Sequence, residues 1–153
     1  MSIASAEQFG SVGVLMGGTA AEREVSLVSG QAVYEALKQQ GVNAIAIDIK
    51  DNAPAQLAAE KLDRVFNVLH GRGGEDGVIQ GLLESMRLPY TGSGVMGSAI
   101  SMDKYRTKLL WQGMGLPTPG FALISSAEDM PAAVELGFPL MVKPVHEGSS
   151  IGM

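Results

Sequence analysis

Short apolar segments alternate with amphipathic segments along the first part of the chain. Three segments are apolar at nearly every position, which is typical of parallel strands that are covered on both faces. They span residues 12–16, 43–48 and 64–69. Helical spacing of apolar side chains predicts helices between and after them, at residues 22–40, 55–62 and 78–86. Because strands and helices alternate, we predict an α/β fold with a Rossmann-like parallel sheet.

The helix predicted at residues 22–40 has one apparent apolar stripe, and we expect this stripe to face the sheet. Its members are Val25, Val28, Ala32 and Ala36. Glu22 lies in the first turn, where the positive end of the helix dipole stabilises a carboxylate.

The apolar pattern continues after residue 92 but does not complete a second sheet. Asp103 is a predicted N-cap, and Leu109, Leu110 and Met114 are predicted to form the buried side of its helix. The remaining predicted elements are strands at residues 88–91, 121–124 and 138–144, and a helix at 127–136 capped by Ser126.

The sequence therefore predicts three regions of different character. Residues 1–10 form a flexible tail, residues 11–92 a Rossmann-like domain, and residues 93–153 the start of a second domain. A Gly/Ser-rich loop after an apolar strand ends the sequence, and complete domains seldom expose such a strand edge. We therefore expect the chain to be a fragment or a truncated form of a longer protein.

Composition excludes several classes of function. With 46% hydrophobic residues among 153, the chain can form a core, and the net charge of −5 without a Lys/Arg cluster argues against nucleic acid as a partner. The absence of cysteine excludes disulfides, a thiolate nucleophile and Cys-ligated zinc, and is compatible with a cytoplasmic location. No signal peptide or apolar run of about 18 residues occurs, so we expect no association with a membrane.

Residues 69–77 join the third predicted strand to the next helix, at the sheet edge where open α/β sheets bind ligands. Four of these nine residues are glycine, so the backbone can approach a ligand closely. His70, Arg72, Glu75 and Asp76 lie among the glycines. Taken alone, the segment is equally compatible with a ligand-binding loop and with a solvated turn.

Residues 92–97, Gly-Ser-Gly-Val-Met-Gly, match the GxGxxG pattern of dinucleotide-binding proteins. However, they follow only a short strand, and Gln112 stands where that fingerprint requires an acidic residue. We therefore do not expect NAD binding. The sequence also contains no GxxxxGK[ST] motif, which excludes a P-loop.

Two lysines lie where a polyphosphate could use them. Lys104 is near a predicted helix start, and Lys143 ends a predicted apolar strand. The glycines and serines of residues 148–152 could offer backbone N–H groups and hydroxyls to phosphate oxygens. For a single lysine, however, a solvated surface charge is the usual role.

Five motifs in order carry a resemblance that covers about residues 12–153. They are Gly17–Ser26, His70–Gly77, Pro89–Gly94, Ser101–Lys104, and Val142–Pro144 with Glu147–Ser150. Together they resemble bacterial D-alanine–D-alanine ligase. The resemblance implies a three-domain enzyme of the ATP-grasp superfamily, of which this chain holds the first domain and the start of the nucleotide-binding domain.

The resemblance also implies roles for individual residues. Glu22 is similar to the carboxylate that holds the ammonium of the first D-alanine, Ser149 to the serine bonded to that glutamate, and His70 to the histidine beside the reacting carboxyl group. Glu75 and Asp76 then serve the structure of the loop. The residues similar to those that contact ATP are Lys104, Lys143, Glu147 and Ser150.

The implied reaction is ATP-dependent ligation of two D-alanines through an acyl phosphate, for peptidoglycan precursor synthesis in the cytoplasm, by a homodimer. No residue here matches a metal ligand of the family, so we expect the Mg²⁺ ligands beyond residue 153 and no catalysis by this chain alone. Two alternatives stay open. One is ligation of D-alanine to D-lactate or D-serine; the other is a non-catalytic Rossmann-like module for dimerisation or ligand binding, which would not need the cluster of candidate residues.

Overall fold

The computed structural model describes residues 5–148 and 151–153. The chain divides into two compact units, Met1–Ala99 and Ile100–Met153, here called unit 1 and unit 2. Each unit is described by itself. Among the described residues, no helix combines the length and the apolar character that crossing a membrane requires.

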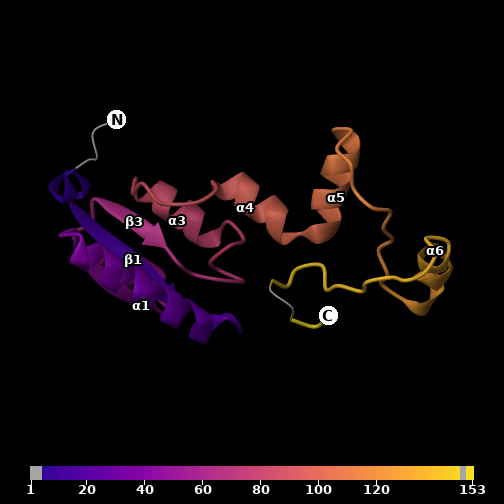
Figure 1. Ribbon diagram of the computed structural model, residues 1–153, viewed down its shortest axis with the longest axis horizontal. Coiled ribbons are helices and arrows are strands. Elements are labelled where there is room, and N and C mark those ends of the chain that lie inside the picture. Colours follow the sequence, from indigo (N-terminus) through magenta and orange to yellow (C-terminus); the bar gives the residue numbers. More distant parts are fainter. Residues whose placement is uncertain (1–4, 149–150) are drawn as a thin grey trace. The chain divides into compact units, whose positions relative to one another are not determined.

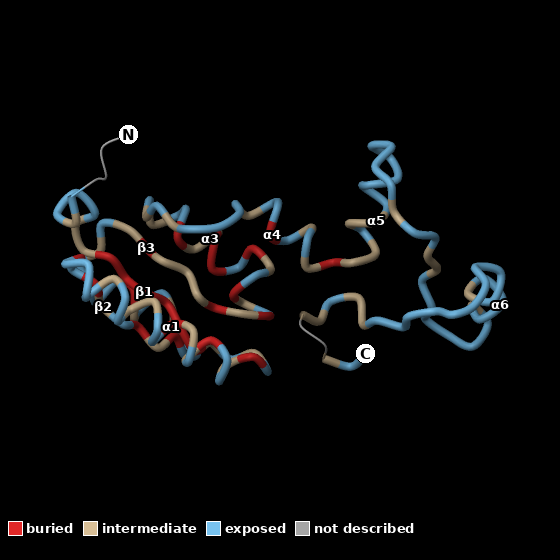
Figure 2. Tube along the Cα trace, in the orientation of Figure 1, coloured by how far each residue is buried: buried red, intermediate tan, exposed pale blue. Residues whose placement is uncertain are grey.

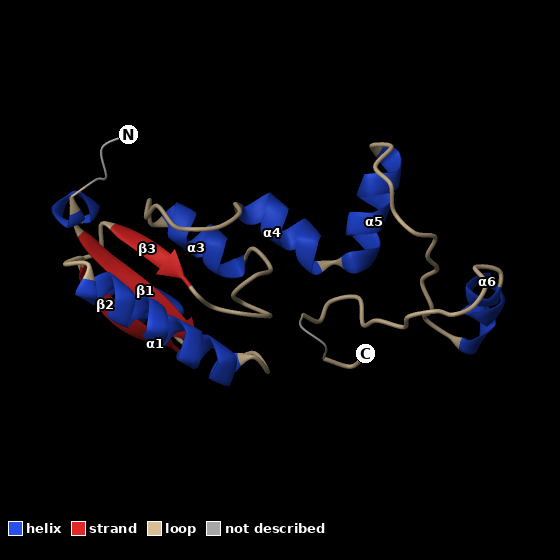
Figure 3. Ribbon diagram, viewed as in Figure 1, coloured by secondary structure: helices blue, strands red, loops and turns tan. Residues whose placement is uncertain are grey.

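Unit 1 is built on a parallel sheet of three strands in the order β2-β1-β3 (Figures 1 and 3). The strands are β1 (Ser11–Gly17), β2 (Asn43–Ile49) and β3 (Arg64–Asn67). The helices that follow them are α1 (Arg23–Gln39), α2 (Ala53–Ala58) and α3 (Val78–Ser85). The predicted α/β class and the parallel sheet are therefore confirmed.

Alternate residues of β1 supply two separate layers of core, because successive side chains of a strand point to opposite faces. Val14 and Met16 pack with Ala44 on the face that α1 covers, through its residues Leu27, Val33, Tyr34 and Leu37. Leu15 lies on the other face, in a cluster to which α2 contributes Leu57 and α3 contributes Ile79 and Leu83. Buried residues therefore follow the strands of unit 1 (Figure 2).

The predicted apolar stripe of α1 was wrong. Val25 and Val28 are 59% and 74% exposed, and Ala32 and Ala36 are exposed as well. The fully buried positions of the helix are Ser26 and Gly30, because the helix lies so close to the sheet that a Cβ at Gly30 would collide with the side chain of Met16. Small residues allow this close approach, and a count of apolar residues does not detect it.

Two elements near the end of unit 1 differ from the prediction. The strand predicted at residues 88–91 is reduced to one parallel bridge between Tyr90 and Val65, supported by the bond from the Val65 amide to the Pro89 carbonyl at 2.8 Å. Helix α4 (Val95–Met102) was not predicted, because residues 92–97 are rich in glycine. The helix begins in unit 1 and ends in unit 2, since unit 1 ends at Ala99. Ahead of β1, Ala6–Phe9 form the 3-10 helix η1 within the predicted tail.

Unit 2 contains helix α5 (Lys104–Gly113), the 3-10 helix η2 (Ala127–Asp129) and helix α6 (Met130–Val134). The Asp103 N-cap of α5 and the Ser126 cap of η2 are confirmed by side-chain bonds to backbone N–H groups. The helix predicted after Asp103 is confirmed as α5, and the helix predicted at residues 127–136 is confirmed as η2 followed by α6. The strands predicted in this region and the predicted buried side of α5 were wrong.

The strands predicted at residues 121–124 and 138–144 form no ladder among the described residues. A strand requires a neighbouring strand for its backbone hydrogen bonds, and no described segment of unit 2 provides one. Val142 is accordingly 81% exposed. The expected buried side of α5 is also exposed, at Leu109 (45%), Leu110 (45%) and Met114 (66%), because the described part of unit 2 contains no apolar layer to cover it.

Candidate functional site

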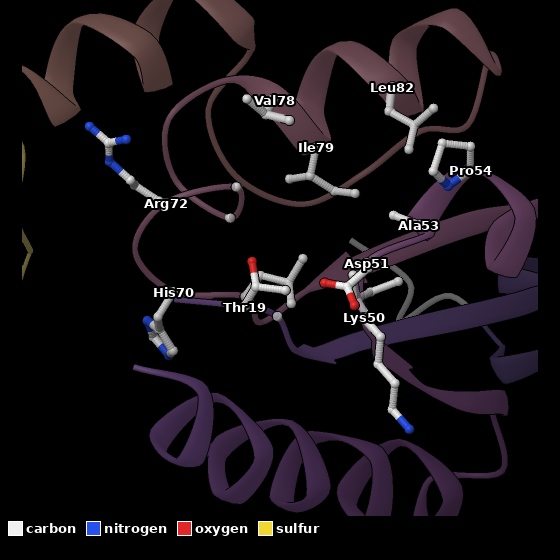
Figure 4. Close-up of a pocket in the computed structure, with 15 residues that line it drawn as sticks. Thr19, Lys50, Asp51, Ala53, Pro54, His70, Arg72, Val78, Ile79 and Leu82 are labelled. Atoms are coloured by element: carbon white, nitrogen blue, oxygen red, sulfur yellow. The ribbon is translucent and has the colours of Figure 1, made fainter. Parts of the chain in front are cut away.

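The loops that follow the three strands of unit 1 meet at one edge of the sheet and surround a cavity of about 320 Å³. Thr19 comes from the loop after β1, Lys50 and Asp51 from the loop after β2, and His70 from the loop after β3. In Figure 4, Thr19 and Asp51 lie opposite Val78, Ile79 and Leu82 of α3, whereas the side chains of Lys50 and His70 extend away from α3. This is the sheet edge at which a parallel α/β fold binds ligands.

The carboxylates of the loop at residues 69–77 bind the loop's own backbone. Glu75 accepts a hydrogen bond from the Gly71 amide at 2.7 Å, and Asp76 accepts one from the Gly73 amide at 2.9 Å. The Gln80 side-chain amide also donates to the Gly74 carbonyl at 2.9 Å. These bonds hold the loop in shape, so the structural role predicted for the two carboxylates is confirmed.

His70 is half-buried at the cavity, with Nδ1 3.9 Å from the Glu75 carboxylate. This distance permits an ion pair when the imidazole is protonated. Glu75 thus accepts the Gly71 amide with one oxygen and places its other oxygen near His70.

Glu22 immediately precedes α1 and is only 6% exposed. Its Oε1 atom is buried without a hydrogen-bond partner among the described residues. The other oxygen lies against Gly71, so close that a Cβ at that glycine would collide with the carboxylate. An unpaired buried carboxylate is unfavourable unless a donor or cation joins it, so this position is suited to hold a cationic amine.

A network that the sequence did not predict holds the turn around Glu22. The Arg23 guanidinium makes two bonds of 2.8 Å to the Asp48 carboxylate and one of 3.0 Å to the Gly18 carbonyl. The bonds to Arg23 lower the pKa of Asp48 and raise that of Arg23 above its usual value. Ser26 Oγ accepts from the Gly17 amide at 2.9 Å and donates to the Val68 carbonyl at 2.6 Å.

Unit 2 contains a second polar cluster, around Asp103. This buried carboxylate accepts bonds from the Arg106 backbone N–H at 2.8 Å and from the Arg106 guanidinium, and His146 Nε2 lies 3.1 Å from it. The Arg106 backbone bond first, and then the Arg106 and His146 side chains, lower the pKa of Asp103 to about 2 although burial raises it. The sequence indicated the N-cap, but no local pattern indicated the contact with His146.

The residues predicted to bind ATP also lie in unit 2. The Lys104 backbone N–H donates to the Val145 carbonyl at 3.0 Å, and its ammonium donates to the carbonyl of Glu147. Lys143 is exposed. Ser149 and Ser150 lie outside the described residues.

The structure thus brings the predicted residues together in two groups. In unit 1, Glu22 lies against the loop that contains His70. In unit 2, Lys104 contacts the backbone of Glu147. The residues that sequence reasoning missed, Arg23, Ser26 and Asp48, act through contacts between distant segments, which a local pattern does not reveal.

Two family models match the chain, one within each unit. A family model described as "D-ala D-ala ligase N-terminus" matches residues 11–54 and 50–93, and one described as "D-ala D-ala ligase C-terminus" matches residues 110–153. The chain is 62% identical over 146 residues to a D-alanine--D-alanine ligase of Pseudomonas entomophila, covering 95% of this chain and 46% of that protein. It is 58% identical over 152 residues to the ligase of Methylococcus capsulatus, covering 99% of this chain and 49% of the relative.

Solved structures of D-alanine--D-alanine ligases are also similar to this chain. The D-alanine--D-alanine ligase of Bacillus anthracis superposes with a TM-score of 0.81 at 35% identity, covering 93% of this chain and 47% of that chain. The same enzyme complexed with ATP gives a TM-score of 0.77 at 33% identity, covering 92% of this chain and 49% of that chain. The chain therefore spans about half the length of the relatives that it matches.

Proposed function

The chain belongs to the D-alanine–D-alanine ligase family, and on that premise we propose that it forms the first-substrate site and part of the ATP site of such a ligase. The proposed reaction joins two D-alanines with cleavage of ATP to ADP and phosphate. Because the chain spans only 46% to 49% of its relatives, the whole reaction also requires groups that this chain does not contain.

The observation that carries this proposal is the carboxylate of Glu22. It is 6% exposed, it has an oxygen without a partner among the described residues, and it lies against the loop that contains His70. The ammonium of D-alanine supplies the charge and the N–H donors that this oxygen lacks. In D-alanine the ammonium and the carboxylate are attached to the same carbon. A D-alanine whose ammonium binds Glu22 can therefore direct its carboxylate toward His70.

The proposed chemistry needs positioning and charge neutralisation more than a protein nucleophile. A carboxylate oxygen of the first D-alanine attacks the γ-phosphorus of ATP, and ADP leaves. The amine of the second D-alanine then attacks the acyl carbon of the acyl phosphate, and phosphate leaves. Lys104 and Lys143 carry the positive charges that suit the phosphate oxygens, and Glu147 lies beside Lys104.

The proposal extends to Mg²⁺, to a homodimer, and to peptidoglycan precursor synthesis in the cytoplasm. We propose that the metal ligands lie in the part of the relatives that this chain does not match. We accordingly propose that this chain alone does not turn over ATP.

A D-alanine titration of the chain, followed by NMR of its backbone amides, tests the role of Glu22. We expect D-alanine to shift amides in residues 17–26 and 69–77, and D-lactate, which has no ammonium, to do so much less. Glu22→Gln should weaken D-alanine binding by about tenfold or more, since a charged hydrogen bond contributes roughly 1.5–3 kcal/mol.

Glu24→Gln is the matched control, because Glu24 is an exposed carboxylate in the same helical turn. This variant should bind D-alanine as the unmodified chain does. Equal affinity of the chain and of Glu22→Gln would refute the role proposed for Glu22.

A further inference from the structure

The first turn of α1 is bonded to the ends of all three strands of unit 1. Ser26 reaches the last residue of β1 through the Gly17 amide at 2.9 Å, and it reaches the segment after β3 through the Val68 carbonyl at 2.6 Å. Arg23 reaches the end of β2 through the carboxylate of Asp48, with two bonds of 2.8 Å. Two side chains, three residues apart on one helix, therefore fix that turn against the sheet edge.

Glu22 is part of the same turn. Its carbonyl accepts the Ser26 amide at 3.0 Å, and Arg23 is its neighbour in the chain. Its own side chain has no capping hydrogen bond at the start of α1. The position of the carboxylate therefore depends on the turn, and the bonds of Ser26 and Arg23 set the position of the turn.

The loop that contains His70 depends on the same serine. Val68, whose carbonyl accepts the Ser26 hydroxyl, lies two residues before His70 and three before Gly71. Ser26 is entirely buried, so water cannot replace these bonds. One hydroxyl thus links the turn that contains Glu22 to the strand end that leads to His70.

We infer that Ser26 and the Arg23–Asp48 pair are positioning residues for the first substrate, because they fix the separation between the Glu22 carboxylate and the His70–Gly71 loop. The inference rests on the proposed function for the identity of the substrate, an amino acid with a free ammonium. None of the three residues needs to contact that substrate. Each affects substrate binding by fixing the position of the Glu22 carboxylate.

The first measurement needs no ligand. In the unmodified chain, a nuclear Overhauser effect should connect the Glu22 side-chain protons to the Cα protons of Gly71, because that carboxylate lies against the glycine. Ser26→Ala and Asp48→Asn should abolish or greatly weaken this signal. If the signal keeps its full strength in both variants, the inference is overturned, whether or not D-alanine binds.

The second measurement adds D-alanine and compares it with D-lactate. Ser26→Ala and Asp48→Asn should each weaken D-alanine binding by about fivefold to tenfold, with little change for D-lactate, since the loss acts through the ammonium-binding carboxylate. If even the unmodified chain fails to bind D-alanine while the nuclear Overhauser effect behaves as expected, the proposed substrate is wrong and the positioning role stands.

Val33→Ala controls for a purely structural effect. Val33 packs α1 on the core cluster of Val14, Met16 and Ala44, away from the turn, so its truncation loosens the same helix without breaking the bonds of Ser26 or Arg23. It should preserve both the signal between Glu22 and Gly71 and the preference for D-alanine. If Val33→Ala at matched loss of stability reduces D-alanine binding as much as Ser26→Ala does, the bonds have no specific positioning role.

Discussion

At the scale of single residues, two glycines of one loop differ in the room that their surroundings leave for a side chain, although their backbone conformations are similar. Gly71 and Gly73 both have positive φ angles, 66° and 79°, which side chains with a Cβ adopt only at a cost of about 1–2 kcal/mol. They differ in their surroundings. A Cβ at Gly71 would collide with the Glu22 carboxylate, whereas a Cβ at Gly73 would meet no atom within 4 Å.

This difference predicts different effects of the same substitution. Backbone strain should lower the free energy of unfolding by about 1–2 kcal/mol in both Gly71→Ala and Gly73→Ala, and the collision with Glu22 should add to this loss in Gly71→Ala. Only Gly71→Ala should also displace Glu22 and abolish the D-alanine-dependent amide shifts. Thermal unfolding and NMR titration of both variants measure the two effects, and equal D-alanine binding by the two variants would contradict the contact with Glu22.

At the scale of elements, α1 and α3 each contain a glycine in the helix interior, but for different reasons. Gly30 of α1 lies against Met16 of β1, where a Cβ would not fit. Gly81 of α3 is open, and its nearest neighbour for an added Cβ is the Val95 side chain at 4.0 Å. The first glycine therefore sets how closely a helix packs, and the second does not.

Alanine should accordingly have opposite effects at the two positions. Gly30→Ala should destabilise unit 1 by roughly 1–3 kcal/mol through overpacking against β1. Gly81→Ala should stabilise it by up to about 1 kcal/mol, because alanine loses less conformational entropy in a helix. Denaturant unfolding of both variants provides the comparison, and destabilisation by Gly81→Ala would show that this position is more crowded than described.

The start of α5 should respond to acid through Asp103. The pKa of this carboxyl is lowered from 3.8 to about 2, so its charged form stabilises the folded state above pH 4, and the stabilisation is lost as the pH falls from about 4 to about 2. Asp103→Asn keeps a capping side chain but removes the charge, whereas Asp103→Ala also removes the cap, at a cost of about 1 kcal/mol.

Amide hydrogen exchange at Arg106 and Thr107, the first turn of α5, reports this response. In the unmodified chain, protection of these amides should fall between pH 4 and pH 2 after correction for the intrinsic exchange rate. In Asp103→Asn the protection should not change over that interval. The same loss of protection in Asp103→Asn would assign the response to another group.

At the scale of the whole molecule, buried apolar residues belong to unit 1 alone among the described residues, and they extend from Val12 to Leu83. In unit 2 the only described residue that is buried is Asp103, and Phe138 and Val142 are 76% and 81% exposed. Burial of apolar surface is the main source of folding stability, so the two units should differ strongly in stability.

Hydrogen exchange across the chain should therefore show two levels of protection. Amides of β1 such as Val14 and Leu15, at the centre of the sheet, should exchange slowest, and those of α5 should exchange orders of magnitude faster because that helix can open locally. Equal protection of β1 and α5 would indicate that the two units unfold as one cooperative body.

The sequence by itself determined the three strands of unit 1, the helices that follow them and the family of the chain. The strands at residues 12–16, 43–48 and 64–69 were predictable because each is apolar over its length, and the Asp103 cap because capping acts within one helical turn. The motifs around Glu22 and His70 carried the resemblance because the spacing of their residue types is itself part of the sequence.

Only the tertiary structure decided which face of α1 is buried and what lies beside Glu22. Val25 and Val28 have the hydrophobicity of core residues, yet Ser26 and Gly30 are buried, because close packing on Met16 favours small side chains. The strand predicted at residues 138–144 did not form, because a strand depends on its neighbours for hydrogen bonds. The hydrophobic pattern of a segment indicates which secondary structure it prefers. Contacts with distant segments determine whether that structure forms and which of its faces is buried.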